Sequence, residues 1–344
     1  MILDASEPGA LPLAADRLAR GGLVAFPTET VYGLGARADD DEAVAAIFAA
    51  KGRPANHPLI VHLAAPAAAI GFASEVPPVA QRLIDAFWPG PLTLILPRRP
   101  GVANAAAGGH ASIGLRCPAH PVAQALLEAA ATLGVAGVAA PSANRFGRIS
   151  PTHASHVQAE FGSGLLVLDG GPCALGIESA IVDCSRERPV LLRPGILTRG
   201  EIEAAAKERL AASDGHAAAA PGTLAKHYAP RARLRLMSTA SLKAALAQLG
   251  ADPAGVAVYS RTALASPGLR VRMMPQAAGD AARELFAALR ELDATGVTLI
   301  WVEEPPENPE WEGVRDRLER AADDSEPGDD AKARTSNRTL LNGP

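Results

Sequence analysis

The sequence has few of the features that usually mark metal sites, disulfide frameworks and common nucleotide sites. Its three cysteines, Cys117, Cys173 and Cys184, show no CxxC spacing, which supports neither a zinc knuckle nor a disulfide framework and favours reduced structural thiols. There is no Walker A loop, no GxGxxG after a predicted strand, no HExxH and no GxSxG. The common phosphate-loop, dinucleotide, zinc-protease and serine-hydrolase classes are therefore not predicted.

The chain also has a small net charge, few aromatic residues and few long apolar runs. The net charge is −4, aromatic residues make up 4% of the chain, and lysine occurs only five times in 344 residues. These values argue against a protein that mainly coats nucleic acid. The longest apolar segment, 119–143, is interrupted by His120, Glu128 and glycines, so it predicts a helix and a strand and no membrane span. No signal peptide is recognised, and a cytoplasmic protein without a membrane partner is expected.

Apolar runs and turn residues predict an α/β chain with two domains. Residues 1–210 contain more strand than helix in their middle part, which favours a twisted mixed sheet. Small and polar residues over 211–232 indicate an interdomain linker. Residues 233–320 show a strand–helix rhythm typical of a smaller, Rossmann-like domain with a parallel sheet. A disordered tail is expected over 321–344.

One early stretch of the first domain combines a strand with polar chemistry. Residues 23–26 read as a buried strand, and Thr28, Glu29, Thr30 and Tyr32 follow in a polar loop that runs to Gly35. Open α/β sheets usually hold ligands at such strand ends. The pattern therefore predicts part of a binding site here.

Three further groups place cationic or hydroxyl side chains beside Gly or Pro at the ends of predicted elements. Taken alone, each member is more often a surface or core residue, so the prediction depends on their joint occurrence. Together they are expected to line a cleft for a highly charged anion such as a nucleoside triphosphate, with lysine as a point charge and arginine as a bidentate fork. The members are Lys51, Arg53, His57 and His62; Ser112, Arg116, Ser142, Asn144, Arg148 and Ser150; and Ser179 and Arg193.

The order and spacing of several short motifs resemble those of the YrdC-like threonylcarbamoyl-AMP synthases, from about residue 8 to residue 210. A later Pro-Gly pair at 221–222 and the run KHYAP at 226–230 resemble the long, two-domain form of that family. The earlier motifs are GLVAFPTETVYGLG at 22–35, KGRP at 51–54, PLIVH at 58–62, SIGLR at 112–116, APSAN at 140–144, GIES at 176–179 and LRPG at 192–195.

The resemblance implies a nucleotidyltransferase, an L-threonylcarbamoyladenylate synthase that makes threonylcarbamoyl-AMP and pyrophosphate from L-threonine, bicarbonate or CO2, and ATP. It implies Mg2+ bound with ATP as the cofactor, and a YrdC-like N-terminal domain. The product would pass to tRNA threonylcarbamoyl transferase proteins, for modification of an adenosine beside the anticodon. A weak direct contact with RNA stays open.

The resemblance also implies roles for individual residues, and it names no protein ligand for a metal. The expected catalytic residues are Lys51, Arg53, Ser142 and Asn144. The expected threonine-binding residues are Thr30, His62, Arg116, Ala140 and Ser179. The expected ATP-binding residues are Arg53, His57, Ser112, Ser142, Ser150, Arg193 and Tyr228. Ala180, His57 and Thr223 depart from residues that are frequent in the family.

Two other functions are compatible with the same predicted fold. One is a plain RNA-binding protein, and the other is a carbamoyltransferase that uses carbamoyl phosphate. The low aromatic content argues against the first, and the absence of cysteine-rich zinc modules argues against the second. Because Tyr228 lies outside the first domain, the linker is also predicted to fold over the cleft as a lid.

Overall fold

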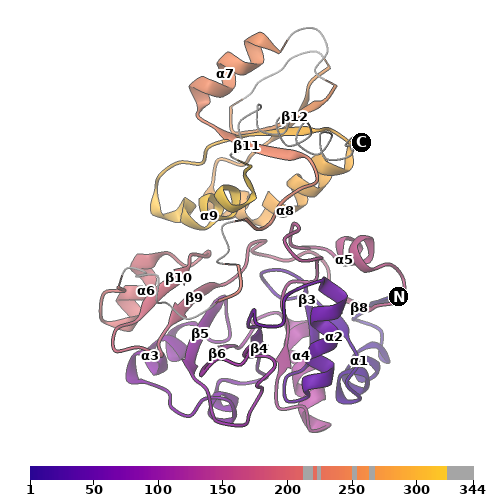
Figure 1. Ribbon diagram of the computed structural model, residues 1–344, viewed down its shortest axis with the longest axis vertical. Helices are drawn as coiled ribbons and strands as arrows, with labels where there is room; N and C mark the ends of the chain where they lie inside the picture. The colour runs from indigo at the N-terminus through magenta and orange to yellow at the C-terminus, as the bar shows by residue number, and fades with distance from the viewer. Residues whose placement is uncertain (212–219, 223–225, 250–253, 263–267, 324–344) are drawn as a thin grey trace, which may run out of the picture.

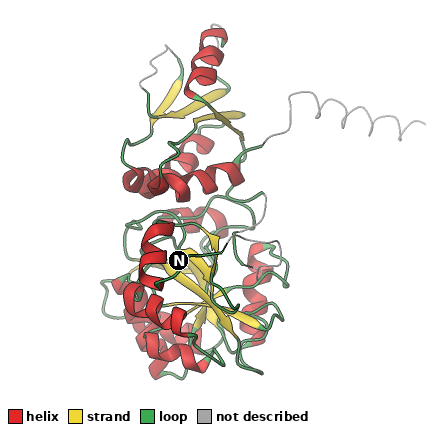
Figure 2. Cartoon of the chain, turned by 90° about the vertical axis from the view of Figure 1, so that its left-hand side faces the viewer, coloured by secondary structure: helices red, strands yellow, loops and turns green. Residues whose placement is uncertain are grey.

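The computed structural model describes residues 1–211, 220–222, 226–249, 254–262 and 268–323, which form two α/β domains around two separate sheets (Figures 1 and 2). The large sheet has the strand order β1-β8-β2-β3-β7-β4-β6-β5-β9-β10 and contains both parallel and antiparallel pairs. The predicted mixed sheet is therefore confirmed. Its strands are β1 (Ile2–Asp4), β2 (Val24–Phe26), β3 (Gly33–Arg37), β4 (Ile60–His62), β5 (Leu92–Pro97), β6 (Ser112–Arg116), β7 (Val138–Ala139), β8 (Leu166–Asp169), β9 (Ala180–Asp183) and β10 (Val190–Arg193).

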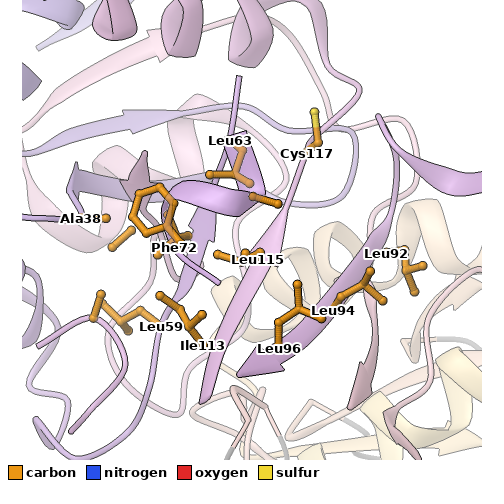
Figure 3. Close-up of a cluster of buried hydrophobic side chains, with 14 of the residues drawn as sticks. Ala38, Leu59, Leu63, Phe72, Leu92, Leu94, Leu96, Ile113, Leu115 and Cys117 are labelled. Atoms are coloured by element: carbon orange, nitrogen blue, oxygen red, sulfur yellow. The ribbon is translucent and has the colours of Figure 1, made fainter. Parts of the chain in front are cut away.

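Helices cover both faces of the large sheet (Figure 2). On one face α1 and α4 pack over β2, β7 and β8, and on the other face α2, α3 and α6 bury a second apolar cluster. Figure 3 shows the second cluster, where leucines of β5 and β6 meet Leu59, Leu63 and Phe72. The helical segments are α1 (Ala10–Ala19), α2 (Asp41–Lys51), η1 (Pro66–Gly71), α3 (Pro78–Phe87), α4 (Pro121–Thr132), α5 (Ala154–Phe161) and α6 (Arg199–Ala206).

Local sequence fixes both ends of α2, the helix that delivers Lys51. Asp40 caps its N-terminus, because its carboxylate accepts hydrogen bonds from the backbone N–H groups of Glu42 and Ala43, each at 3.0 Å. Gly52 ends the helix in the left-handed conformation with φ 64°, which glycine adopts without steric cost. Lys51 is therefore held in the last helical turn.

The C-terminal domain contains a four-stranded parallel sheet, as the sequence predicts. Its strand order is β11-β14-β12-β13. Its helix α7 covers one face, whereas α8 and α9 cover the other face and lie between the small sheet and the large domain (Figure 1). The elements are β11 (Arg233–Met237), α7 (Thr239–Gln248), β12 (Val256–Ser260), β13 (Arg270–Met273), α8 (Ala278–Ala294), β14 (Leu299–Glu303), η2 (Pro309–Trp311) and α9 (Glu312–Ala321).

Some local predictions are wrong. The polar loop after β2 ends at Tyr32, because residues 33–37 form β3 and pair with β2. Gly35 supplies space there: a Cβ atom would lie 2.8 Å from both Phe26 and Val138. Helices α5 and α9 are not anticipated. The predicted domain boundaries remain predictions, and 212–219, 223–225 and 324–344 of the linker and tail lie outside the described residues.

A buried carboxylate at the end of β14 gives the C-terminal domain a pH dependence. Burial alone would raise the pKa of Glu303, but hydrogen bonds from Ser260, Thr239 and the backbone N–H groups of Thr262 and Arg261 outweigh it and lower the pKa from 4.5 to about 2. A carboxyl group with a lowered folded-state pKa stabilises the fold fully above pH 4.5 and loses this contribution as the pH falls toward 2.

We therefore expect Glu303→Gln to lower the free energy of unfolding at pH 7 by about 2 kcal/mol and to flatten its decline between pH 4.5 and 2. Thermal unfolding of the two proteins across this pH range measures both effects. A variant that keeps the wild-type slope would show that another group is responsible.

Candidate active site

The predicted site residues converge on one small cavity of about 50 Å³ between the large sheet and the linker. Strand ends, the last turn of α2 and the turn after β7 supply its walls, and residues 221–222 and 227–228 of the linker close it. The sequence-predicted residues that line it are Thr30, Lys51, Arg53, His62, Arg116, Ala140, Ser142, Asn144, Ser179, Arg193 and Tyr228.

Lys51 joins α2 to the turn that follows β7. Its buried ammonium group donates hydrogen bonds to the carbonyl oxygens of Ser142, at 2.6 Å, and Asn144, at 2.5 Å. Burial, together with the charge of Arg53, lowers the pKa of Lys51 well below its usual value. Lys51 therefore fixes the Ser142–Asn144 turn while placing its positive charge at the cavity wall.

Two buried arginines supply the remaining positive charge of this wall. Arg53 donates to the Pro58 carbonyl oxygen at 3.0 Å, and burial lowers its pKa to about 10. Arg193 donates to the Ser179 carbonyl oxygen at 2.9 Å and to the linker through the Pro221 carbonyl oxygen at 2.8 Å. An anion that enters the cavity would meet a preorganised cationic surface.

A second part of the cavity wall combines an arginine with imidazole and hydroxyl groups. Arg116 lies 2.7 Å from Glu29 and donates to the Thr30 hydroxyl at 2.9 Å, so its guanidinium is held in one orientation. Burial and the charge of Arg116 lower the pKa of His62 to about 3, which keeps its ring neutral at pH 7. The Ser179 hydroxyl lies 2.8 Å from that of Thr93. A carboxylate, an amine and a hydroxyl could each find a partner here.

Four buried polar atoms at this cavity have no hydrogen-bond partner within the part of the chain that the structure describes. They are Nδ1 of His62, Oδ1 of Asn144, Nδ1 of His227 and the phenol oxygen of Tyr228. Buried polar groups are almost always paired, so a cluster of unpaired ones indicates places that a ligand fills.

Three predicted ATP-binding residues do not line the cavity. His57 packs against Phe146, which does line it, with ring centroids 5.5 Å apart. Ser112 begins β6 opposite Pro97. Ser150 is fully buried and donates to the carboxylate of Glu178 at 2.5 Å. Their assignment to ATP remains a prediction.

Glu29, from the polar loop predicted to form part of the site, holds Arg116. The structure also brings in residues to which the sequence assigns no role: Glu178 and His227 line the cavity. Arg317, from the C-terminal domain, pairs with Glu178 at 2.8 Å. Glu178 stands in the GIES motif beside Ser179, so its position in the sequence is a signal, but no local pattern identifies Arg317.

The described residues contain no group of three or more His, Cys, Asp or Glu side chains placed to hold a metal ion. Within the same residues, none of the helices has the length and apolar character needed to cross a lipid bilayer. All three cysteines are buried and free, as predicted.

Fold and site together define a two-domain α/β protein with a cationic, hydroxyl-lined pocket between its first domain and the linker. Residues 16–195 match the Sua5/YciO/YrdC family model, described as telomere recombination, and residues 197–323 match the model of the threonylcarbamoyl-AMP synthase C-terminal domain. The chain belongs to the threonylcarbamoyl-AMP synthase family, and the predicted enzyme class, a nucleotidyltransferase, is confirmed.

Relatives match nearly the whole chain. The threonylcarbamoyl-AMP synthase of Pyrococcus abyssi is 38% identical over 92% of this chain and 95% of its own. That of Bacillus subtilis is 37% identical over 90% of this chain and 92% of its own. The crystal structure of P. abyssi Sua5 complexed with L-threonine superposes with a TM-score of 0.82 at 38% identity, covering 91% of this chain and 94% of that one.

Proposed function

We propose that this protein makes threonylcarbamoyl-AMP and pyrophosphate from L-threonine, bicarbonate or CO2, and ATP. The observation that carries the proposal is the cavity itself: an amino-acid wall around Arg116 and His62 and a cationic wall formed by Lys51, Arg53 and Arg193 line the same small space. Unpaired buried polar atoms lie among the residues that line it. The geometry suits a reaction between an amino acid and a nucleotide that are held side by side.

The chemistry requires no protein nucleophile. The neutral amine of threonine adds to CO2 and loses a proton to give a carbamate. A carbamate oxygen then forms a bond to the α-phosphorus of ATP, and the bond from that phosphorus to the bridging oxygen breaks, so that pyrophosphate carries away the negative charge. The protein's task is to position both reactants and to neutralise the polyanion.

Each wall then has a defined task. Arg116 binds the threonine carboxylate, while His62, Thr30 and Ser179 bind its amine and hydroxyl, with the Ala140 carbonyl as a further acceptor. Lys51, Arg53 and Arg193 hold the phosphates, and the Ser142–Asn144 turn shapes the space between the two substrates. These assignments follow the family resemblance, and the charges of the residues that line the cavity support them.

Mg2+ enters with ATP as part of the substrate in this proposal. Glu178, which lines the cavity, is already paired with Arg317, and Glu29, behind Arg116, is paired with that arginine. The donor set of the described residues therefore does not fit a resident metal ion, and the phosphates themselves would bind Mg2+. Transfer of the product to tRNA threonylcarbamoyl transferase proteins is part of the same proposal.

The reaction is tested by mass spectrometry of the product formed from ATP, isotopically labelled bicarbonate and threonine. We expect threonylcarbamoyl-AMP that contains the labelled carbon, and pyrophosphate release that depends on threonine. Pyrophosphate release that requires carbamoyl phosphate in place of bicarbonate would favour the carbamoyltransferase alternative. Salt-sensitive RNA binding without any ATP turnover would favour the RNA-binding alternative.

The linker is proposed to act as a lid. Residues 221–222 and 227–228 of the linker line the cavity, so displacing them would open it to the substrates. Burial raises the pKa of Tyr228 to about 12, so its phenol stays neutral and can donate a hydrogen bond to a phosphate. Closure would shield the labile carbamate and adenylate from water.

We expect Tyr228→Ala to raise the KM for ATP about tenfold, which corresponds to the loss of one good hydrogen bond and its packing. Steady-state pyrophosphate release at saturating threonine measures this. The matched control is Tyr259→Phe, since Tyr259 is buried in the small sheet and does not line the cavity. An unchanged KM in Tyr228→Ala would contradict the lid.

A further inference from the structure

One arginine of the C-terminal domain reaches the loops that build the active site. Arg317 lies on α9, and its side chain is 0% exposed. Its Nε donates to the Glu178 carboxylate at 2.8 Å, its Nη2 to the Glu178 carbonyl oxygen at 3.2 Å, and its Nη1 to the Pro194 carbonyl oxygen at 3.0 Å. A single guanidinium thus binds two separate segments of the N-terminal domain.

Both segments carry residues of the cavity wall. Glu178 immediately precedes Ser179, and Pro194 immediately follows Arg193. Ser179 and Arg193 are themselves joined, because the arginine donates to the serine carbonyl oxygen at 2.9 Å and to its hydroxyl at 3.2 Å. Any displacement of Glu178 or Pro194 would therefore move a cationic group and a hydroxyl group of the site together.

Glycines let the C-terminal domain approach these segments at backbone distance. A Cβ atom on Gly313, in α9, would lie 2.5 Å from the Gly195 carbonyl oxygen. A Cβ atom on Gly176 would lie 2.4 Å from the backbone of Arg283, in α8. At both points the two domains approach each other through their backbones. Helices α8 and α9 therefore pack directly against the segments that carry Ser179 and Arg193.

The positive charge of Arg317 balances a buried carboxylate next to the site. Glu178 is buried and accepts a second hydrogen bond from Ser150, at 2.5 Å, on its other oxygen. A buried carboxylate that loses its counter-charge is strongly unfavourable. Either its loop shifts toward water or the carboxylate takes up a proton. Arg317 also lies 5.4 Å from the centre of the Tyr228 ring, which stacks on Phe286 of α8. The same guanidinium therefore contacts the proposed lid.

We propose that Arg317 is a positioning residue of the active site, through which the C-terminal domain holds Ser179, Arg193 and Tyr228 in place for the substrates. This inference rests on the proposed function for the identity of the substrates. It assigns the second domain a direct part in forming the site. The competing explanation is that Arg317 only fastens the two domains together.

Arg317→Ala tests the inference, with KM and kcat measured separately for threonine and ATP. We expect the KM for threonine to rise on the order of 30-fold, with a smaller fall in kcat. The reason is that displacing Ser179 and Arg193 weakens substrate binding more than it slows the chemical step. Guanidinium at tens of millimolar should restore activity several-fold by filling the vacated space, whereas methylammonium should not. Arg315→Ala is the matched control, because Arg315 lies on the same helix and donates to the carbonyl oxygens of Pro306 and Asn308.

Arg317→Lys covers the case in which the alanine variant does not fold. Lysine keeps the positive charge but lacks the planar guanidinium group that donates to both Glu178 and Pro194. We therefore expect the KM for threonine to rise about fivefold. A wild-type KM for both substrates in the lysine and alanine variants, with only a lower melting temperature, would establish the fastening role and overturn the inference. An equal effect of Arg315→Ala would also overturn it.

Failure of the proposed function can be told apart from failure of this inference. If the wild-type protein forms no threonylcarbamoyl-AMP, the proposed function is wrong. The stabilisation of the protein by ATP in thermal unfolding then still tests Arg317, since it needs no product. Weaker ATP stabilisation in Arg317→Lys than in Arg315→Ala would support the inference, and equal stabilisation would reject it.

Discussion

Replacing Lys51 with methionine is expected to lower kcat/KM for threonine-dependent pyrophosphate release about a thousandfold, which corresponds to about 4 kcal/mol of transition-state stabilisation. The ammonium is buried, and its hydrogen bonds to Ser142 and Asn144 fix it beside the cavity. Methionine keeps the length of the side chain but provides neither the charge nor the two hydrogen bonds. The developing negative charge on pyrophosphate and the turn that shapes the site would both lose their support.

Lys243→Met is the matched control, because Lys243 is exposed on α7 of the C-terminal domain. It should keep the wild-type kcat/KM. Thermal unfolding of both variants separates a loss of catalysis from a loss of folded protein. A Lys51→Met protein that is folded and within tenfold of wild-type kcat/KM would show that Lys51 does not stabilise the transition state.

Elements that carry their own start and stop signals could be predicted from the sequence. The Asp40 cap and Gly52 define α2, and alternating turns and apolar runs define the strands of both sheets. β3 could not be predicted, because Gly33 and Gly35 are typical of a loop. Gly35 is needed in the strand because Phe26 and Val138 occupy the space of a side chain there, and only tertiary packing reveals this.

The candidate site could be predicted to the extent that its residues stand in short motifs. Lys51, Arg116 and Arg193 each lie within one, and the structure brings all three to one cavity. Arg317 could not be predicted, because α9 is a highly charged helix in which its arginine resembles the others. Its burial depends on a carboxylate 139 positions away in the sequence. Long-range pairs of this kind leave no local pattern.

Recognition of the threonine side chain gives the second large effect. Valine has nearly the same shape as threonine and lacks only the hydroxyl group. His62, neutral and with an unpaired Nδ1, lies in the cavity wall with the hydroxyls of Thr30 and Ser179. With valine bound, Nδ1 of His62 would stay unpaired, and an unpaired buried polar atom is costly. The methyl group that valine adds in place of the hydroxyl recovers none of that cost.

We therefore expect kcat/KM for threonine to exceed that for valine by several thousandfold, measured as amino-acid-dependent pyrophosphate release under identical conditions. His62→Leu should reduce this ratio to on the order of a hundredfold by slowing the reaction with threonine while leaving valine nearly unchanged, because leucine offers the threonine hydroxyl no partner and valine has no hydroxyl that needs one. Serine keeps the hydroxyl and lacks only a methyl group, so its kcat/KM should fall no more than about a hundredfold below that of threonine. A wild-type preference for threonine over valine of less than tenfold would mean that the hydroxyl group meets no buried partner, and the assignment of the wall around His62 and Arg116 to threonine would then be wrong.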